Sequence, residues 1–308
     1  MEPWGCRRAG AVVLLLTLAA CSGGQAVDGP AASQPPAPRG AVTVVAAGDI
    51  STCPSVDCGP ADTAALVDDI DPKAVLTLGD NQYPSGELVD FQEKYAKTWG
   101  RFTDITHPAP GNHEYYASPD ADGYFAYFGE AAHPGTDGYY SFDLGDWHLV
   151  ALNSNDECKK VACDDGSEQQ RWFADDLATS DARCTLAYWH HPRWSTGEHR
   201  DTESADALWQ TAADGGVDLV LNGHDHDYER FVAQDADGVA DKQGTVEIVA
   251  GTGGVALRDF AEPAGPLTAA RVEDHKGVLR LDLGAQSYAW QFVAVGGDVL
   301  DLGRDDCS

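Results

Sequence analysis

Apolar residues form short unbroken runs along the chain, and several of these runs end in glycine and a polar residue. The run at 74–78, Ala-Val-Leu-Thr-Leu, is followed by Gly79 and Asp80. Such a run indicates a strand buried on both faces, as in a parallel sheet. Similar runs predict further strands at 41–47, 184–189, 217–221, 245–249, 277–283 and 287–295, with a short extended piece at 108–110.

Apolar residues at helical spacing lie between these strands. They predict helices at 61–70, 87–98, 167–179 and 202–213. In the clearest of these, 167–179, Ser167 and Gln170 have the spacing of a capping box, and Trp172, Phe173 and Leu177 share one face. Strand and helix therefore alternate through the first half of the chain, which is typical of an α/β fold.

The later part of the chain is richer in strands. Residues 139–144 and 147–153 alternate between apolar and polar, which predicts an antiparallel hairpin with its turn at Gly145 and Asp146. Residues 115–137, rich in aromatic side chains and glycine, are expected to form a loop. We therefore expect one folded α/β domain, in which two mixed sheets pack face to face with helices outside.

The first forty residues differ in composition from the rest. Arg7 and Arg8 precede an apolar stretch at 11–18, which is shorter than the ~20 residues needed to span a bilayer. The stretch leads into Leu-Ala-Ala-Cys at 18–21, which resembles the processing box of bacterial lipoproteins. We expect export to the bacterial cell surface through a lipid on Cys21; the alternative is a plain signal peptide and secretion. The expected segments are a lipoprotein signal peptide at 1–20, a disordered Ala/Pro-rich tether at 21–40 and the folded domain at 41–308.

The cysteines agree with export. Apart from Cys6 and Cys21, they are two close pairs and two single residues: Cys53 with Cys58, Cys158 with Cys163, and Cys184 and Cys307. Several pairings are possible. The close pairs suggest local disulfide loops, and a Cys184–Cys307 bridge would fix the C-terminal end. A zinc site is the alternative, but the spacings are not those of zinc ribbons, and an oxidising compartment favours disulfides.

The charge of the chain limits its partners. It has 50 acidic and 20 basic residues and a formal charge of −30. A surface this acidic repels nucleic-acid polymers and anionic lipid. We therefore expect no nucleic-acid partner, and we expect the protein to contact a membrane only through its lipid anchor. An anionic substrate must then be attracted by a local positive charge, which bound metal ions would supply.

Polar residues that can bind metal ions follow the predicted strands. They are, in chain order, Asp49, Asp80 with Tyr83, Asn112 with His113, His190, and His224 with His226. Ligands of open α/β sheets bind at the carboxyl ends of the strands, so we expect these side chains to share one mouth. Carboxylate, phenolate and imidazole groups suit hard or borderline ions. The set predicts two metal ions with Asp80 between them.

The ordered motifs resemble those of the calcineurin-like metallophosphoesterases and, within them, the purple acid phosphatases. The resemblance is carried by Asp49, Gly79-Asp80-x-x-Tyr83, Gly111-Asn112-His113-Glu114, His190 and Gly223-His224-x-His226. It implies a four-layer α/β/β/α sandwich. The chain departs from the wider family's Asp-x-His motif, having Asp49-Ile50-Ser51, and Tyr83 supplies the replacement ligand as in purple acid phosphatases. Those enzymes usually carry glycine at the position of Ser51.

The resemblance also implies roles for individual residues. Asp49, Asp80, Tyr83 and His226 would hold the first ion, and Asp80, Asn112, His190 and His224 the second. The expected pair is Fe³⁺ with a divalent ion (Zn, Mn or Fe), with other divalent pairs possible. The expected catalytic residues are His113, which protonates the leaving group or steadies the transition state, and His199, which lies where some purple acid phosphatases keep another substrate-side histidine.

Residues beside the motifs have expected roles as well. Glu114 and Asp225 are expected to orient ligand imidazoles, and His191 to lie behind them or pack. Aromatic side chains are expected to crowd the mouth, which would favour phosphate monoesters over diesters. These are Tyr115, Tyr116, Tyr124, Phe125, Tyr127 and Trp194.

The expected function is an exported, monomeric phosphatase that hydrolyses phosphate monoesters of small molecules through attack by a metal-bridging hydroxide. One alternative is a phosphodiesterase or nucleotidase on the same metal centre. An alternative of another class is a non-catalytic lipoprotein that binds metal or phosphate. The presence of His113 disfavours the last of these, because a binding protein needs no such residue.

Overall fold

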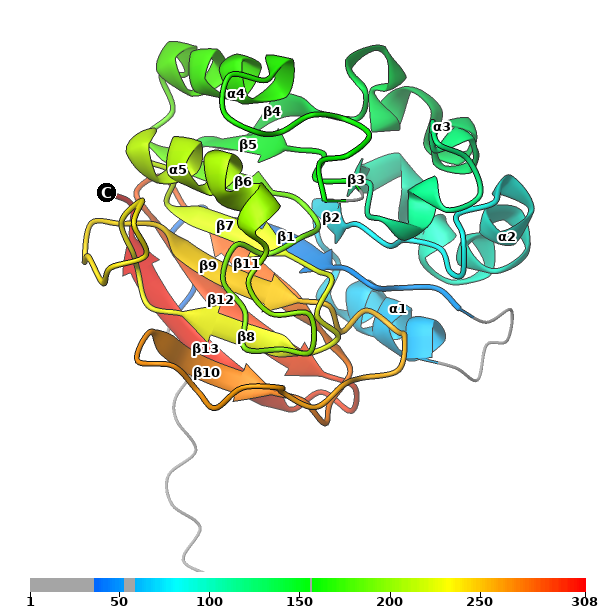
Figure 1. The fold of residues 1–308 in the computed structure, drawn as a ribbon. Coiled ribbons are helices and arrows are strands. Elements are labelled where there is room, and N and C mark those ends of the chain that lie inside the picture. Colours follow the sequence, from blue (N-terminus) through cyan, green and yellow to red (C-terminus); the bar gives the residue numbers. More distant parts are fainter. Residues whose placement is uncertain (1–35, 53–58, 156) are drawn as a thin grey trace, which may run out of the picture. The chain divides into compact units, whose positions relative to one another are not determined.

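Two mixed sheets lie at the centre of the fold (Figure 1). The structure is a computed structural model that describes residues 36–52, 59–155 and 157–308. The six-stranded sheet has the order β13-β12-β11-β1-β2-β3, and the seven-stranded sheet has the order β10-β8-β9-β7-β6-β5-β4. Strands β1 to β3 run parallel to one another, as do β5, β6, β7 and β9, whereas the remaining neighbours pair antiparallel.

The elements have the following bounds. The strands are β1 Val42–Ala47, β2 Ala74–Leu78, β3 Thr106–Ala109, β4 Tyr140–Leu144, β5 Trp147–Ala151, β6 Cys184–Tyr188, β7 Leu219–Asn222, β8 Tyr228–Phe231, β9 Val246–Ala250, β10 Thr268–Val272, β11 Gly277–Leu283, β12 Ser287–Ala294 and β13 Val299–Asp306. The helices are α1 Gly59–Ile70, α2 Leu88–Glu93, α3 Asp122–Phe128, α4 Glu168–Thr179 and α5 Asp206–Asp214, with short 3₁₀ turns between them.

The apolar strands are covered on one face by the other sheet and on the other face by helices. In β1, Val44 and Ala46 pack in the core between the sheets, whereas Val45 and Ala47 face the helices on the outside. Successive side chains of a strand point to opposite faces, so a strand covered on both faces must be apolar throughout. Helices α1 to α3 cover the six-stranded sheet, and α4 and α5 cover the seven-stranded one (Figure 1). The expected four-layer α/β/β/α sandwich of two mixed sheets is confirmed.

Some predicted elements were wrong. The helix expected at 87–98 is only α2, followed by 3₁₀ turns at Tyr95–Lys97 and Trp99–Ile105. Phe91, Tyr95 and Trp99 are all buried. Three separate turns therefore bury side chains at the same four-residue spacing that one continuous helix would bury, and the apolar pattern does not distinguish the two. The expected loop at 115–137 contains α3, which buries Tyr124 and Phe128. The strands β8, β10 and β13 were not predicted, because each contains polar residues that break the apolar pattern.

Several local predictions hold. Strands β4 and β5 form the expected hairpin, and Ser167 Oγ accepts a hydrogen bond from the N–H of Gln170 at the start of α4. Gln170 Oε1 accepts from Gly166 N and not from Ser167 N, so the capping box is only half formed. Among the described helices, none is long and apolar enough to cross a membrane.

Two cysteine pairings appear as expected. Cys158 is bonded to Cys163, and Cys184 to Cys307. The second bridge joins the start of β6 to the C-terminal end and spans 123 residues of sequence. Cys53 and Cys58 lie outside the described residues, as do Cys21 and most of the segment expected to be the tether.

Candidate metal centre

The expected ligands lie together because they follow strands that end at the same edge. Asp49 follows β1, Asp80 follows β2 and Asn112 follows β3 in the six-stranded sheet. His190 follows β6 and His224 follows β7 in the facing sheet. Hydrogen bonds join the two sheets here, since the N–H of His224 donates to Asp49 Oδ2 at 2.7 Å.

One group of ligand atoms surrounds the hydroxyl of Tyr83. Its Oη lies 2.6 Å from Asp49 Oδ1 and 2.8 Å from Asp80 Oδ2. His226 Nε2 lies 3.2 Å from the same hydroxyl and 3.3 Å from Asp49 Oδ1. These are the four residues expected at the first ion.

A second group surrounds Nε2 of His190. This atom lies 3.1 Å from Asn112 Oδ1, 3.3 Å from Asp80 Oδ2 and 3.3 Å from His224 Nδ1. These are the four residues expected at the second ion. One atom, Asp80 Oδ2, belongs to both groups, as a bridging ligand requires.

The hydrogen bonding of two histidines fits a cation between these atoms. His190 Nδ1 lies 2.8 Å from the Leu78 carbonyl, and His226 Nδ1 lies 2.9 Å from the Ala256 carbonyl. A carbonyl only accepts, so each Nδ1 carries a proton, and the Nε2 that can give its lone pair to an ion faces inward. There both lone pairs meet oxygen atoms of Asp49, Asp80 or Asn112. Lone pairs that converge in this way are the donor set of a metal ion.

Charge around Asp80 keeps it ionised. Burial opposes its charge, but His190 and His113 beside it hold the pKa of the carboxyl well below its usual range. Burial would lower the pKa of His190, whereas Asp80 raises it, with a net value of about 9. Tyr83 differs, since burial and then Asp49 and Asp80 raise its pKa well above the usual value.

The backbone is strained at three of the ligands. Asp49, Asp80 and His224 have positive φ angles of 59°, 49° and 72°. Residues with a side chain rarely adopt this region, at a cost of about 1–3 kcal/mol each. Each of these residues follows a glycine and turns the chain sharply at a strand end. A Cβ on Gly79 would lie only 2.6 Å from His190 Nδ1, so the strand end and the imidazole can approach only because Gly79 has no side chain.

Glu114 holds the backbone of the site, and the expectation that it orients an imidazole was wrong. Its carboxylate accepts N–H groups from Asp80, Asn81, Gln82 and Gly111, at 2.6 to 3.2 Å. The residue is 1% exposed. Burial and then Asp80 raise its pKa to about 8, although the N–H donors oppose this shift. The loops after β2 and β3 are therefore fixed to each other through one side chain.

Asp225 and His191 also act on the surrounding chain. Asp225 accepts hydrogen bonds from Ser195 Oγ and from the N–H of His199, so the expectation that it orients a ligand imidazole was wrong too. It fixes the segment that carries His199. His191 is buried, its Nδ1 lies 2.9 Å from Ser154 Oγ, and its ring lies 4.3 Å from that of His224.

The candidate catalytic residues contact different ligands. His113 Nδ1 lies 2.6 Å from the Pro84 carbonyl, and its Nε2 lies 3.7 Å from Asp80 Oδ2. Its ring contacts that of Tyr83 at 4.0 Å between centroids. The ring of His199 stacks on His224 at 4.2 Å.

A cleft of about 350 Å³ opens over the ligands. Besides ligand residues it is lined by His113, Tyr116, Glu157, His191, His199 and Arg258. The expected crowding by aromatic rings was wrong apart from Tyr116, because Tyr115 and Tyr124 are buried in the core. Sequence reasoning missed Glu157 and Arg258, since neither lies in a motif or beside one.

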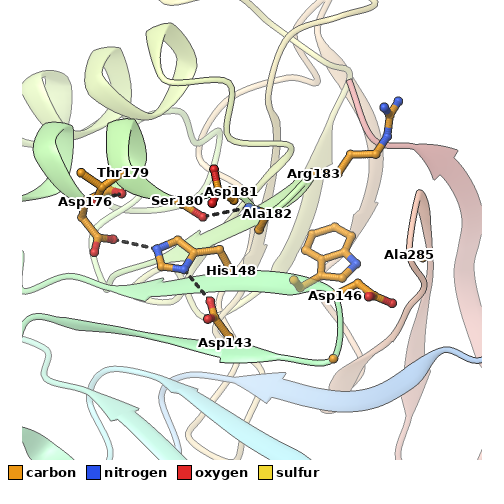
Figure 2. A pocket seen from close by; sticks show the side chains of 12 residues that line it. Asp143, Asp146, His148, Asp176, Thr179, Ser180, Asp181, Ala182, Arg183 and Ala285 are labelled. Carbon is orange, nitrogen blue, oxygen red and sulfur yellow. Dashed lines mark hydrogen bonds and ion pairs between the residues drawn. The ribbon is translucent and has the colours of Figure 1, made fainter.

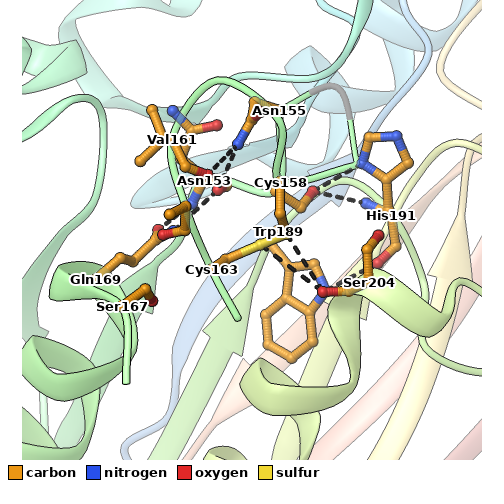
Figure 3. Close-up of a disulfide and its surroundings, with 12 residues drawn as sticks. Asn153, Asn155, Cys158, Val161, Cys163, Ser167, Gln169, Trp189, His191 and Ser204 are labelled. Atoms are coloured by element: carbon orange, nitrogen blue, oxygen red, sulfur yellow. Dashed lines mark hydrogen bonds between the residues drawn. A yellow bond between two sulfur atoms is a disulfide. The ribbon is translucent and has the colours of Figure 1, made fainter. Parts of the chain in front are cut away.

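A disulfide stabilises one rim of the cleft (Figure 3). Cys158 and Cys163 close a short loop directly after Glu157. Asn155, which precedes this loop, donates from Nδ2 to the carbonyl of Val161 inside it at 2.8 Å. The bridge therefore limits the motion of the chain that brings Glu157 to the cleft.

A larger cavity, of about 600 Å³, lies elsewhere (Figure 2). His148, near the start of β5, lies 2.9 Å from Asp143 Oδ1 through Nδ1 and 2.8 Å from Asp176 Oδ2 through Nε2. Arg183 also lines this cavity. Both nitrogens of the imidazole are thus engaged by carboxylates of the protein itself.

Comparison with known proteins agrees with the fold and the motifs. Residues 42–228 match the calcineurin-like phosphoesterase family. Purple acid phosphatase 15 of Arabidopsis thaliana is 34% identical over 150 residues, which cover 43% of this chain and 27% of that protein. An uncharacterised protein of Mycobacterium tuberculosis, Rv2577, is 30% identical over 185 residues, covering 48% of this chain and 35% of that protein. The chain thus spans only 27% and 35% of the length of these two relatives.

Solved structures share the fold at low sequence identity. A purple acid phosphatase from yellow lupin (Lupinus luteus) has a TM-score of 0.66 at 19% identity, covering 86% of this chain and 53% of that one. A dimetal phosphatase from Danio rerio has a TM-score of 0.56 at 15% identity, covering 87% and 99%. With more than half of its residues matching the family, the chain belongs to the calcineurin-like phosphoesterases.

Proposed function

We propose that this protein is an exported dinuclear-metal phosphatase that hydrolyses phosphate monoesters of small molecules. One observation carries the proposal: Asp80 Oδ2 is within 3.3 Å of both Tyr83 Oη and His190 Nε2, so one carboxylate oxygen serves two groups of ligands. The matched family and the purple acid phosphatase relatives support the same chemistry.

The residues of the chain have separate tasks in this reaction. Asp49, Asp80, Tyr83 and His226 would hold one ion, and Asp80, Asn112, His190 and His224 the other. When bound, such ions supply positive charge for the phosphoryl oxygens and lower the pKa of a water. His113 uses Nδ1 to contact the Pro84 carbonyl, which leaves Nε2 facing the ligands. A proton on Nε2 can pass to the leaving oxygen of the ester.

The ion pair we propose is Fe³⁺ with a divalent ion. The place of Tyr83 supports this, because its hydroxyl lies among the atoms of Asp49, Asp80 and His226, and a phenolate is a ligand that suits a hard ion. Metal analysis and visible absorption of natively purified protein test the assignment. Tyr83→Phe should bleach a coloured wild-type protein. A colourless, iron-free enzyme that hydrolyses monoesters would reject iron and keep the phosphatase.

The phosphodiesterase or nucleotidase alternative has gained support from one observation. The cleft is lined by Tyr116, Glu157 and Arg258, with most of the expected aromatic rings elsewhere, so a second alcohol group has more room than expected. The deciding experiment compares kcat/KM for an aryl phosphate with that for the matching bis-aryl phosphate. We expect the monoester to be favoured by about tenfold or more, because a dianion gains more from the bound ions. Equal rates would reassign the protein as a diesterase.

Export and the lipid anchor are part of the proposal. They rest on the apolar stretch and Leu-Ala-Ala-Cys at 18–21, and on the disulfides, which suit an oxidising compartment. Cys21→Ser should move the protein from the membrane fraction to a soluble or unprocessed form. An unchanged distribution would favour ordinary secretion.

A further inference from the structure

Arg258 places a permanent positive charge at the mouth of the cleft. It lines the cleft together with His113, Tyr116 and the metal ligands, and its side chain is 34% exposed. It lies outside residues 42–228, the part of the chain that matches the family. The family motifs therefore assign it no role.

The backbone of Arg258 is held in place by contacts with His226, a candidate ligand. Its backbone N–H donates to the His226 carbonyl at 3.1 Å. Two residues earlier, the Ala256 carbonyl lies 2.9 Å from His226 Nδ1. The segment 256–258 thus orients the imidazole of His226, a candidate ligand, and fixes the position of the Arg258 backbone beside it. Because both contacts use backbone atoms of 256–258, a change of the Arg258 side chain leaves them intact.

The guanidinium is held toward the substrate side of the cleft. Its Nη1 donates to His199 Nε2 at 2.7 Å, and the His199 ring stacks on His224. Nη1 also lies 3.1 Å from Glu198 Oε2. Both contacts use Nη1; for Nε and Nη2, the described residues offer no hydrogen-bond partner. These two N–H bearing groups form one edge of the planar fork that binds carboxylate and phosphate oxygens in pairs.

We propose that Arg258 is a substrate-binding residue that selects phosphate monoesters carrying a second anionic group on the alcohol half. The inference rests on the proposed phosphatase function, because the bound ions take the phosphoryl group to be cleaved. A second anion on the same molecule then meets Arg258, the only arginine or lysine among the described residues that line the cleft. In a chain of formal charge −30, one fixed cation at the entrance has a large effect on which anions are retained.

The test uses substrates that differ in one charge and little in shape. Carboxyphenyl phosphates, with the carboxylate meta or para, are compared with the corresponding carbamoylphenyl phosphates. Wild-type protein should favour the carboxylate member of at least one pair by about tenfold in kcat/KM. Arg258→Gln should abolish the preference and Arg258→Lys should keep part of it. Arg200→Gln is the matched control, since Arg200 is 62% exposed, pairs with Glu262 and does not line the cleft.

A binding measurement separates this inference from the proposed function. The corresponding benzylphosphonates cannot be hydrolysed, and calorimetry on metal-loaded protein gives their Kd. Tighter binding of the carboxylate form that is lost in Arg258→Gln supports the role of Arg258 even if no phosphate ester is cleaved. Hydrolysis and binding without a carboxylate preference in the wild type, or a preference that survives in Arg258→Gln, would overturn the inference and leave the phosphatase standing.

Discussion

Two regions of this protein bring histidine together with aspartate, and they differ in how the histidine is used. Near the start of β5, both nitrogens of His148 face carboxylates, so a protonated imidazole satisfies the cluster. At the carboxyl ends of β2 and β6, His190 gives Nδ1 to a backbone carbonyl and turns Nε2 toward oxygens of Asp80 and Asn112. Only the second arrangement brings a second imidazole nitrogen, Nδ1 of His224, and an amide oxygen to the same nitrogen atom.

The backbone separates the two regions as well. Asp49, Asp80 and His224 have positive φ angles, and none of the residues with such angles among the described part of the chain belongs to the His148 cluster, although its cavity is the larger one. Strain of this kind persists only where the surroundings impose it, and it gathers at functional sites. Positive φ alone does not mark the centre, because Asp71 and Ala121 share it in turns elsewhere. At the candidate ligands it occurs together with imidazole nitrogens that converge on shared oxygen atoms, which the size of a cavity does not reveal.

The largest contrast between the regions is expected for Asp80→Asn. Loss of the shared carboxylate should lower the occupancy of both ions and reduce kcat by more than the roughly 10²–10³-fold that the loss of one transition-state donor costs. His148→Gln should change neither. Metal analysis and steady-state kinetics of both variants are the measurements. Two ions and normal turnover in Asp80→Asn would refute the dinuclear centre.

His113→Ala should reduce kcat by about 10²–10⁴ if the residue protonates the leaving group. The reason is that His113 Nε2 lies 3.7 Å from Asp80 Oδ2 and belongs to neither group of ligand atoms, while its Nδ1 is engaged by the Pro84 carbonyl. The loss should shrink for esters with acidic leaving groups, measured as the slope of log kcat against leaving-group pKa. An unchanged slope would leave His113 as a binder of the transition state.

The sequence predicted the ligands because their spacing follows from the fold. Runs such as 74–78 must be buried strands, and a polar residue after each one must lie at the edge of the sheet where the strands end. Arg258 could not be predicted this way. It reaches the cleft through a loop after β9 that is held by a backbone contact to His226, and a lone arginine in a loop carries no pattern.

The role of Glu114 was beyond the sequence for a related reason. Its four N–H partners come from two loops that meet only after β2 and β3 have paired. The helix α3 was missed because the glycines of 115–137 favour a loop, whereas burial of Tyr124 and Phe128 in the core beside the sheet stabilises the helix. In both cases contacts between segments far apart in the chain, which a local sequence pattern does not contain, determine the local structure.

A smaller effect is expected for Glu114→Gln, which changes the support of the candidate ligands but none of the ligands themselves. Glutamine keeps the shape but offers one acceptor oxygen and sets an NH₂ group against backbone N–H donors. The loops of Asp80 and Asn112 should loosen, and metal affinity should fall by about 10–100-fold, as for other residues that position ligands. Competition with a chelator measures the affinity. Wild-type affinity in Glu114→Gln would mean that the backbone alone holds the ligands.

The smallest expected effect concerns His148, the residue of the satisfied cluster. Its hydrogen bond to Asp176 raises its pKa, burial opposes this, and Asp143 adds to the rise. A histidine with a raised pKa in the folded state stabilises fully below its unfolded pKa of about 6.5, and the contribution is lost as pH rises through the folded value.

We therefore expect His148→Gln to lower the free energy of unfolding by about 1 kcal/mol at pH ~6, a modest value because Asp143 is 78% exposed. The difference from wild type should shrink as the pH is raised above about 6.5 through the higher folded pKa. Denaturant unfolding of metal-saturated protein across this range measures it, with kcat as the control, since the cluster lies away from the cleft. A difference that stays constant with pH would mean that His148 acts by packing alone, and a loss of kcat at constant metal content would mean that the two regions are coupled.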